Sequence, residues 1–174
     1  MGRVAVIGNA GGGKSTLCRK LSLAKGIPLY SIDKVQWKAG WVRASPHEIR
    51  QRHEEILSSN QKWIIDGWGG WDDLKTRFAA ADTIIFVDFP LWVHYWWGFK
   101  RQFASLFVKN TDFPEGCLLW PKTLELFNLM WVIHCDIRPH LSQLIDSFGE
   151  GRLVIHLRSP KELRRFIREQ CPGS

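Results

Sequence analysis

Residues 8 to 15 read Gly-Asn-Ala-Gly-Gly-Gly-Lys-Ser, which matches the pattern G-x-x-x-x-G-K-[ST] of a phosphate-binding loop. This pattern works only between a buried strand and a helix. Residues 3–7 form a short apolar, β-branched run, and residues 15–21 open a helical pattern. Because both flanks are present, we expect the chain to begin with a strand, a glycine-rich loop and a helix.

The chemistry of this loop depends on its backbone. Glycines let successive N–H groups turn toward one centre, and the helix N-terminus adds a partial positive charge there. We expect Lys14 to reach the β- and γ-phosphates and the Ser15 hydroxyl to ligate Mg²⁺, so the predicted cofactors are ATP and Mg²⁺. The residues predicted to contact the triphosphate are Gly8, Asn9, Ala10, Gly11, Gly12, Gly13, Lys14, Ser15 and Thr16.

Helical and strand-like stretches alternate along the chain, which favours an α/β fold with a five-stranded parallel sheet. The expected strands are residues 3–7, 26–33, 62–67, 82–88 and 151–158. The expected helices after the first are residues 45–58, 72–80, 90–108 and 122–148, and one that begins after Ser159.

Two of these helices begin with capping boxes, Ser45-Pro46-His47-Glu48 and Ser159-Pro160-Lys161-Glu162, in which the serine and the glutamate satisfy free backbone N–H groups. His53 is expected to be exposed on the first of them. Between the fourth and fifth strands, two helices enclose a polar stretch. We interpret residues 100–138 as a helical lid inserted into one domain of residues 1–174.

Each of the three strands after the first ends in an aspartate, namely Asp33, Asp66 and Asp88. Because ligands bind at the carboxyl ends of parallel strands, we expect these carboxylates to converge near the phosphate loop. Each could hold Mg²⁺ through water, accept a proton from an acceptor hydroxyl or grip the acceptor. We assign the base to Asp33 or Asp66 and support of Mg²⁺ to Asp88. An aspartate that only caps a turn is the alternative for each residue alone.

Composition limits the classes to which the chain can belong. Its 174 residues suit one domain. The four cysteines are scattered and contain no C-x-x-C pair, which predicts neither disulfides nor a zinc site and favours a cytoplasmic location. Asp88, Pro90 and His94 interrupt the most apolar stretch, residues 84–99, so we expect no membrane partner.

The formal net charge of +7 indicates an anionic partner, and the phosphates of a nucleotide satisfy that requirement. The charge also permits weak nucleic-acid binding through a basic surface on the last helix, at Lys161, Arg164, Arg165 and Arg168. A solvated amphipathic helix is the simpler interpretation of this stripe.

Ten tryptophans are an unusual number for a chain of this length. Trp37, Trp41, Trp68 and Trp71 lie in segments expected on the acceptor side, where they either stack on a substrate or pack under loops. Others, with phenylalanines, have helical spacing and are interpreted as core or as a dimer contact; they are Trp92, Trp96, Trp97, Phe99 and Phe103. The sequence leaves monomer and homodimer open.

Taken together, the phosphate loop, residues 32–42, the strand end at residues 63–67, residues 82–90 and the Arg158-Ser159-Pro160 turn resemble one family. They are similar to small bacterial P-loop kinase-like proteins known as DNA topology modulation proteins, which are themselves similar to adenylate kinase. The resemblance runs nearly end to end.

This resemblance implies a three-layer P-loop nucleoside triphosphate hydrolase fold with a helical lid. It also implies that Arg158, Ser159 and Pro160 lie near the adenine, and it singles out Arg101 and Arg138 as the cations that stabilise the transferred phosphoryl group. The implied activity is transfer of the γ-phosphoryl group of ATP–Mg²⁺ to a small acceptor, either a nucleotide, a nucleoside or another metabolite. The alternative is a nucleotide-dependent regulatory or DNA-associated protein with little kinase activity.

Overall fold

The computed structural model describes residues 1–59, 61–107 and 116–172. Its main sheet has five parallel strands in the order β2-β5-β1-β6-β7. The five-stranded parallel α/β architecture predicted from the sequence is confirmed. The strands are β1 (Arg3–Gly8), β2 (Leu29–Ser31), β5 (Trp63–Asp66), β6 (Thr83–Val87) and β7 (Leu153–Leu157).

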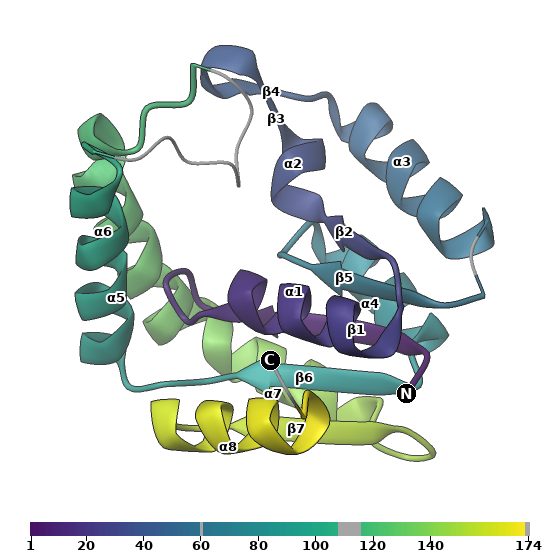
Figure 1. Ribbon diagram of the computed structural model, residues 1–174. Coiled ribbons are helices and arrows are strands. Elements are labelled where there is room, and N and C mark those ends of the chain that lie inside the picture. The colour runs from purple at the N-terminus through teal and green to yellow at the C-terminus, as the bar shows by residue number, and fades with distance from the viewer. Residues whose placement is uncertain (60, 108–115, 173–174) are drawn as a thin grey trace.

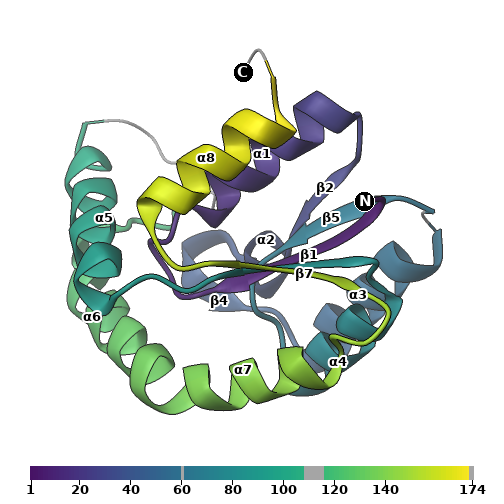
Figure 2. The same cartoon turned by 90° about the horizontal axis from the view of Figure 1, so that it is seen from below.

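Helices cover both faces of this sheet, which gives the predicted three layers (Figure 2). On one face lie α1 (Lys14–Lys25) and α8 (Pro160–Gln170). On the other lie α3 (Pro46–Ser59), α4 (Trp71–Ala80) and α7 (Arg138–Ser147).

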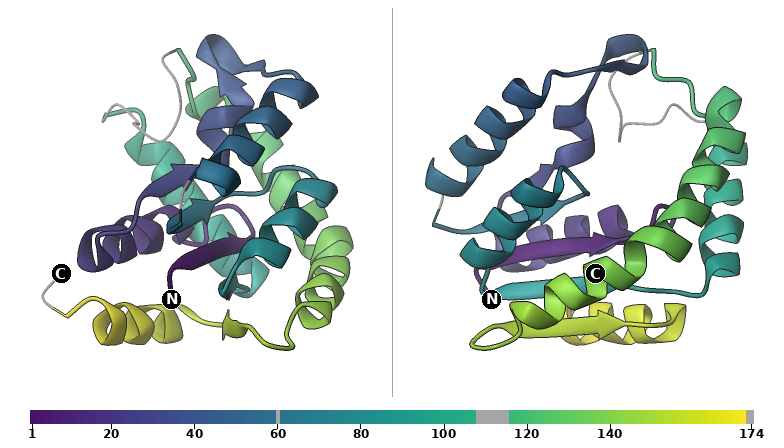
Figure 3. Two further views of the ribbon diagram at one scale, coloured as in Figure 1. Left: turned by 90° about the vertical axis from the view of Figure 1, so that its right-hand side faces the viewer. Right: turned by 180° about the vertical axis from the view of Figure 1, so that it is seen from behind.

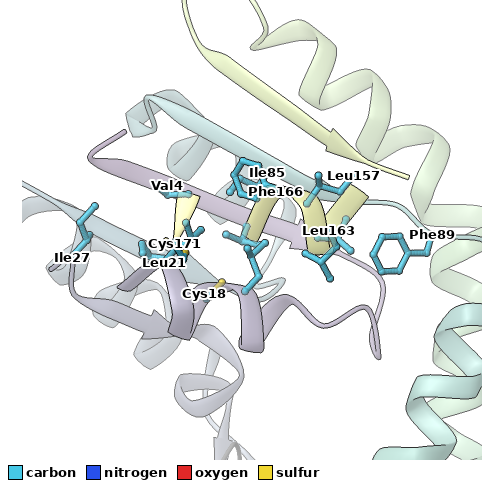
Figure 4. Packing of buried hydrophobic residues seen from close by; sticks show 14 of the residues in the cluster. Val4, Cys18, Leu21, Ile27, Ile85, Phe89, Leu157, Leu163, Phe166 and Cys171 are labelled. Carbon is cyan, nitrogen blue, oxygen red and sulfur yellow. The ribbon is translucent and has the colours of Figure 1, made fainter. Parts of the chain in front are cut away.

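The alternation of side chains along β1 builds two cores. Val4 and Val6 enter a cluster with Leu17 of α1 and Leu163 of α8, part of which Figure 4 shows. Ala5 and Ile7 face the opposite cluster, under α4 and α7. A strand buried on both faces reads as a continuous apolar run, which is why the first strand was easy to identify.

A small hairpin and its flanking turns stand above the sheet on one side of the molecule (Figure 1). It comprises α2 (Ile32–Gln36), β3 (Trp37–Lys38), the 3₁₀ turn η1 (Ala39–Trp41) and β4 (Val42–Arg43). The second strand is therefore shorter than predicted. It ends at Ser31, and Asp33 lies in the first turn of α2 rather than at the strand end.

On the opposite side stand α5 (Leu91–Ala104) and α6 (Thr123–Val132), which pack against each other. Helix α5 ends at Ala104, earlier than the end predicted at residue 108. The predicted helix 122–148 is a bent rod in which the π-helical turn η3 (Ile133–Ile137) joins α6 to α7 (Figure 3, right). The 3₁₀ turn η2 (Trp120–Lys122) precedes it. The predicted lid therefore comprises the end of α5, η2, α6 and η3, together with residues 108–115, which lie outside the described residues.

Both predicted capping boxes start helices, but only the first is complete. The Ser45 N–H donates to Glu48 (2.8 Å), and the Glu48 N–H donates to Ser45 Oγ (3.2 Å). At the second, Ser159 Oγ accepts from the Glu162 N–H, whereas the Glu162 carboxylate accepts from the N–H of Arg158 (2.7 Å). The second carboxylate therefore ties down the turn before the helix.

Candidate functional site

The phosphate loop joins β1 to α1 and requires its glycines. Gly11 and Gly13 have positive φ values of 70° and 77°, which glycine adopts without steric cost. A Cβ on Gly11 would lie 2.7 Å from the carbonyl oxygen of His94, and one on Gly13 would lie 3.0 Å from the ring of Trp97. Helix α5 thus packs so closely on the loop that any side chain there would displace it.

Polar side chains hold the loop in shape. The amide of Asn9, itself 6% exposed, donates to the Met130 carbonyl of α6 (2.8 Å) and accepts from the Ala10 N–H (2.8 Å). Lys14 Nζ donates to the Asn9 carbonyl (2.8 Å). The ammonium is therefore already curled over the loop, where the β- and γ-phosphates of a nucleotide would lie.

His94 is a second support, and the sequence did not reveal its role. It is 1% exposed, and its Nδ1 lies 2.9 Å from the Ala10 carbonyl. Burial and the neighbouring Lys14 lower the pKa of His94 to about 4. The imidazole is therefore neutral near pH 7, and Nδ1 carries the proton because a carbonyl can only accept.

Two of the predicted site residues, Ser15 and Asp66, are hydrogen-bonded to each other. The Ser15 hydroxyl donates to Asp66 Oδ2 at 2.7 Å. Asp66 is 4% exposed, and its other oxygen, Oδ1, is buried without a hydrogen-bond partner among the described residues. A buried, partnerless carboxylate oxygen is costly, so this atom indicates a place where a donor or a cation binds.

Beside this pair opens a pocket of about 180 Å³ that contains Asp33 and Arg101. A Cβ on Gly67, at φ 110°, would lie 3.3 Å from Asp33 Oδ1, so the Asp-Gly sequence after β5 makes room for this carboxylate. The structure thus brings together four of the predicted site residues from four elements. The pocket is lined by Ser15, Arg19, Leu29, Ser31, Asp33, Lys34, Asp66 and Arg101.

The two carboxylates of the pocket influence each other. Burial raises the pKa of Asp33, and the negative charge of Asp66 raises it further. Lys14 and Arg101 oppose this shift but do not cancel it. Asp33 therefore binds a proton more readily than an ordinary aspartate, which suits a group that accepts a proton from a substrate.

Asp88 and Arg138 form a separate group. Arg138 donates from Nε to Asp88 Oδ1 and from Nη2 to Oδ2 (2.9 Å), and His156 Nε2 lies 2.9 Å from the same Oδ2. Burial would raise the pKa of Asp88, but the hydrogen bonds from Arg138 and His156 outweigh it and hold that pKa below its ordinary value. Both oxygens of this carboxylate are thus in use.

A buried arginine that the sequence did not mark lies behind the turn after β5. Arg77 is 0% exposed and donates to the Gly67 carbonyl (2.7 Å) and to His53 Nε2 (3.2 Å). Burial lowers the pKa of Arg77 to about 10, so it stays charged near pH 7. His53 is 2% exposed, and the prediction that it is exposed was wrong.

Two further predicted segments flank the loop. Thr16 follows Ser15 at the start of α1 and is exposed, and its hydroxyl oxygen lies 3.5 Å from Arg19 Nη2. The Arg158-Ser159-Pro160 turn joins β7 to α8, and α8 packs on α1. The placement of this turn near the adenine stays a prediction.

The hairpin contacts residues 117–118, which belong to the segment predicted to be a lid. The indole N–H of Trp41 donates to the Leu118 carbonyl (3.0 Å), and the Trp41 N–H donates to the Cys117 sulfur (3.4 Å). Trp41 itself has a φ of 63°, which strains a bulky residue. This contact bridges the two sides of the molecule above the sheet (Figure 1).

These residues fit ATP and Mg²⁺ on their own chemistry. The glycine loop leads from β1 into the N-terminus of α1, where backbone N–H groups and the helix dipole favour phosphate, and Lys14 Nζ lies against the loop. Ser15 and the partnerless oxygen of Asp66 are hard oxygen ligands of the kind that Mg²⁺ prefers. This donor set fits the phosphates and the metal, and the pocket that contains Ser15 and Asp66 also holds Asp33 and Arg101.

No family model matches this chain, and no curated protein sequence matches it significantly. Solved structures of low sequence identity do match its fold. Shikimate kinase from Acinetobacter baumannii, in complex with shikimate, is 14% identical, with a TM-score of 0.53 over 97% of this chain and 90% of that one. Shikimate kinase from Aquifex aeolicus is 16% identical, with a TM-score of 0.51 over 96% and 92% of the two chains.

A third structure, shikimate kinase from Bacteroides thetaiotaomicron, is 14% identical and has a TM-score of 0.53 over 96% of this chain and 94% of that one. These similarities extend over nearly the whole of each chain, so the chain has the fold of the P-loop kinases. At this identity they establish the fold and not the substrate.

Proposed function

We propose that the protein transfers the γ-phosphoryl group of ATP–Mg²⁺ to a small acceptor. The observation that carries the proposal is the contact of Ser15 with Asp66, because it joins the phosphate loop directly to a pocket that holds Asp33 and Arg101. A protein that only bound nucleotide would not need two carboxylates, of which Asp66 is buried and Asp33 partly buried, in a pocket beside its phosphate loop.

The loop residues bind and orient the donor. Backbone N–H groups of residues 9–15 and the ammonium of Lys14 hold the phosphates, while His94 and Asn9 keep the loop rigid. The bound metal would neutralise charge on the phosphates as the phosphoryl group leaves. Such prearranged positive charge is the main source of catalysis in phosphoryl transfer.

For the metal we favour Ser15 and Asp66. The sequence pointed to Ser15 and Asp88, but both oxygens of Asp88 are engaged by Arg138 and His156. Asp66 Oδ2 already accepts a hydrogen bond from Ser15, and Asp66 Oδ1 has no hydrogen-bond partner among the described residues. Asp88 would then act on the metal only if Arg138 left it.

Asp33 is our candidate for the base. It lies in the pocket with a raised pKa, whereas one oxygen of Asp66 already accepts the hydrogen bond from Ser15. Arg101 lies near enough to lower the pKa of Asp33, and it would carry the positive charge opposite the transferred group. Arg138 would act from the other side, beside the loop.

The acceptor is proposed as a small molecule with a free hydroxyl group. The pocket volume of about 180 Å³ suits a compact metabolite or one part of a nucleoside. The matching structures are shikimate kinases, which supports a hydroxylated metabolite. The resemblance to topology modulation proteins and adenylate kinase supports a nucleotide, so both classes belong in the test.

The test is release of ADP from ATP–Mg²⁺ against a panel of nucleoside monophosphates, nucleosides and hydroxylated metabolites. We expect one class to stimulate release, Lys14→Ala to abolish it, and Asp33→Asn to abolish it while ATP binding persists. Lys161→Ala, an exposed position on α8, is the matched control. Tight ATP binding without stimulation by any acceptor would instead support the regulatory or DNA-associated function. Turnover that survives Lys14→Ala would refute the assigned loop.

A further inference from the structure

One face of α5 carries a row of exposed aromatic side chains. Trp92, Trp96, Phe99 and Phe103 are 69%, 51%, 42% and 49% exposed, and Phe107, just beyond the helix, is 75% exposed. Their spacing of three or four residues places them on one side of a helix. We call these five residues the aromatic row. The sequence left core or a dimer contact open for these residues. Exposure excludes core for Trp92, Trp96, Phe99 and Phe103, whereas Trp97 packs against the core under α1 and α8.

The row is a continuous surface rather than a set of isolated rings. Trp96 stacks near Phe99 with a centroid distance of 6.5 Å, and Phe99 stacks near Phe103 at 6.2 Å. Phe103 contacts Phe107 edge-on at 5.5 Å and Trp120 of η2 at 6.4 Å. Scattered exposed apolar residues need no explanation, but a contiguous patch marks an interaction site.

The area is large enough for a stable interface. With ~200 Å² for each whole aromatic residue, the exposed fractions of the row and of Trp120 amount to ~650 Å². The largest apolar patch of an ordinary monomer is about 300–600 Å², and a standard interface buries about 800 Å² on each partner. Leu106, which is 49% exposed and donates its N–H to the Phe103 carbonyl, adds to this area.

Helix α5 cannot simply turn to hide this row, because its opposite face is already used. Val93, His94, Gly98 and Gln102 are buried. His94 bonds to the phosphate loop, and Gln102 donates to the Leu119 carbonyl (3.1 Å). Rotating the helix would break these contacts, so the row stays on the surface unless another molecule covers it.

The charges around the row favour a second copy of the same chain. In the described part of α5, Lys100 is the exposed charged residue, and its Nζ lies 4.8 Å above the Trp96 ring. Arg101 instead lines the acceptor pocket. Helices that bind lipid surfaces carry many lysines and arginines beside the apolar face, and this one does not. A nearly uncharged face can pair with its own copy without strong repulsion.

We propose that the aromatic row is the contact of a two-fold symmetric homodimer, in which α5 of each chain packs against α5 of the other. Every contact in such a pairing occurs twice, so a few aromatic residues supply most of the binding energy. The inner face of the same helix supports the phosphate loop, which places the dimer contact one helix away from the nucleotide site.

The test is the mass in solution, measured by light scattering and by sedimentation equilibrium at tens of micromolar protein. We expect twice the chain mass of 20.2 kDa. The double variant Trp96→Glu/Phe103→Glu should be a monomer, with dimer affinity at least about 100-fold weaker. Leu23→Glu is the matched control, because Leu23 is 83% exposed on α1, away from the row; it should remain a dimer.

Far-UV circular dichroism and ATP binding of the double variant show whether it is folded. If it is not, the milder Phe99→Ser/Phe103→Ser replaces it. A monomeric wild type, or a dimer that persists in a folded row variant, would overturn the proposal. A wild type that is monomeric and sediments with phosphatidylserine vesicles, while the row variant does not, would assign the surface to lipid instead.

Discussion

The ion pair between Arg138 and Asp88 provides the sharpest test of the site electrostatics. Replacing Arg138 by Met keeps the length of the side chain and removes its charge. The Asp88 side chain is 5% exposed, whereas that of Arg138 is 44% exposed. Breaking a fully buried pair costs about 3–5 kcal/mol, and a surface pair contributes about 0–1 kcal/mol. For this half-buried pair, we expect Arg138→Met to lower the free energy of unfolding by about 2 kcal/mol.

The expected loss has a pH dependence whose sign follows from the pKa of Asp88. In the wild type that pKa is lowered, so Asp88 contributes stability above the ordinary carboxyl range and loses it as the pH falls through the lowered value. In the variant, burial acts on Asp88 with only His156 to oppose it, so the carboxyl takes up a proton at a higher pH. The stability gap between the two proteins should therefore be widest near pH 7 and narrow below about pH 4.

Urea unfolding at pH 7 and at acidic pH, followed by tryptophan fluorescence, measures the difference in the free energy of unfolding. In thermal unfolding at pH 7, the expected decrease in Tm is about 4–8 °C. Asp88→Asn/Arg138→Met should recover part of the loss, because it removes the buried charge that Arg138→Met leaves unpaired. Arg165→Met is the control, since its pair with Glu169 is exposed; it should change little. A gap that is absent at pH 7, or that widens as the pH falls, would refute the assigned pairing.

Two further outcomes test the loop and the lid. Gly11→Ala should weaken ATP binding, measured by calorimetry, at least about tenfold, because its Cβ would lie 2.7 Å from the His94 carbonyl oxygen. Gly26→Ala is the control and should leave ATP binding intact, because Gly26 has a similar φ of 62° but open space around it. Equal losses of ATP affinity in the two variants would contradict the steric argument. Trp41→Phe removes the hydrogen bond to Leu118, so we expect faster hydrogen exchange at residues 116–122; unchanged exchange would show that this bond does not hold the lid.

The sequence predicted most of the fold because its signals are local. A glycine loop between an apolar run and a helical pattern can form in few ways, and the box at Ser45 and Glu48 started its helix as expected. The sequence did not predict the ends of strands and helices where tertiary contacts determine them. Asp33 reads as the end of a strand, but β2 ends at Ser31 because its pairing with β5 ends there, at Asp66.

The sequence pointed to the individual candidate residues but not to which of them lie together in the structure. Ser15, Asp33, Asp66 and Arg101 share one pocket, whereas Asp88 is held by Arg138 beside the loop. Three aspartates after three strands look alike in a sequence, and their partners come from residues up to 68 positions away. The distinction among them therefore depends on the packing of distant helices, which no local pattern encodes.

The charges explain why Asp33 and Asp66 can lie so close together. Two neighbouring carboxylates in a partly buried pocket repel: after burial, the charge of Asp66 is the second cause of the raised pKa of Asp33. Arg77, charged and fully buried, acts on both from below, and Lys14 and Arg101 act on Asp33 from the loop and the lid. Of these three cations, Lys14 is the one that must also serve the phosphates. When a nucleotide engages Lys14, the carboxylates lose part of their compensation, and a divalent cation between Ser15 and Asp66 would restore it. We therefore expect metal and nucleotide to bind together more tightly than either binds alone.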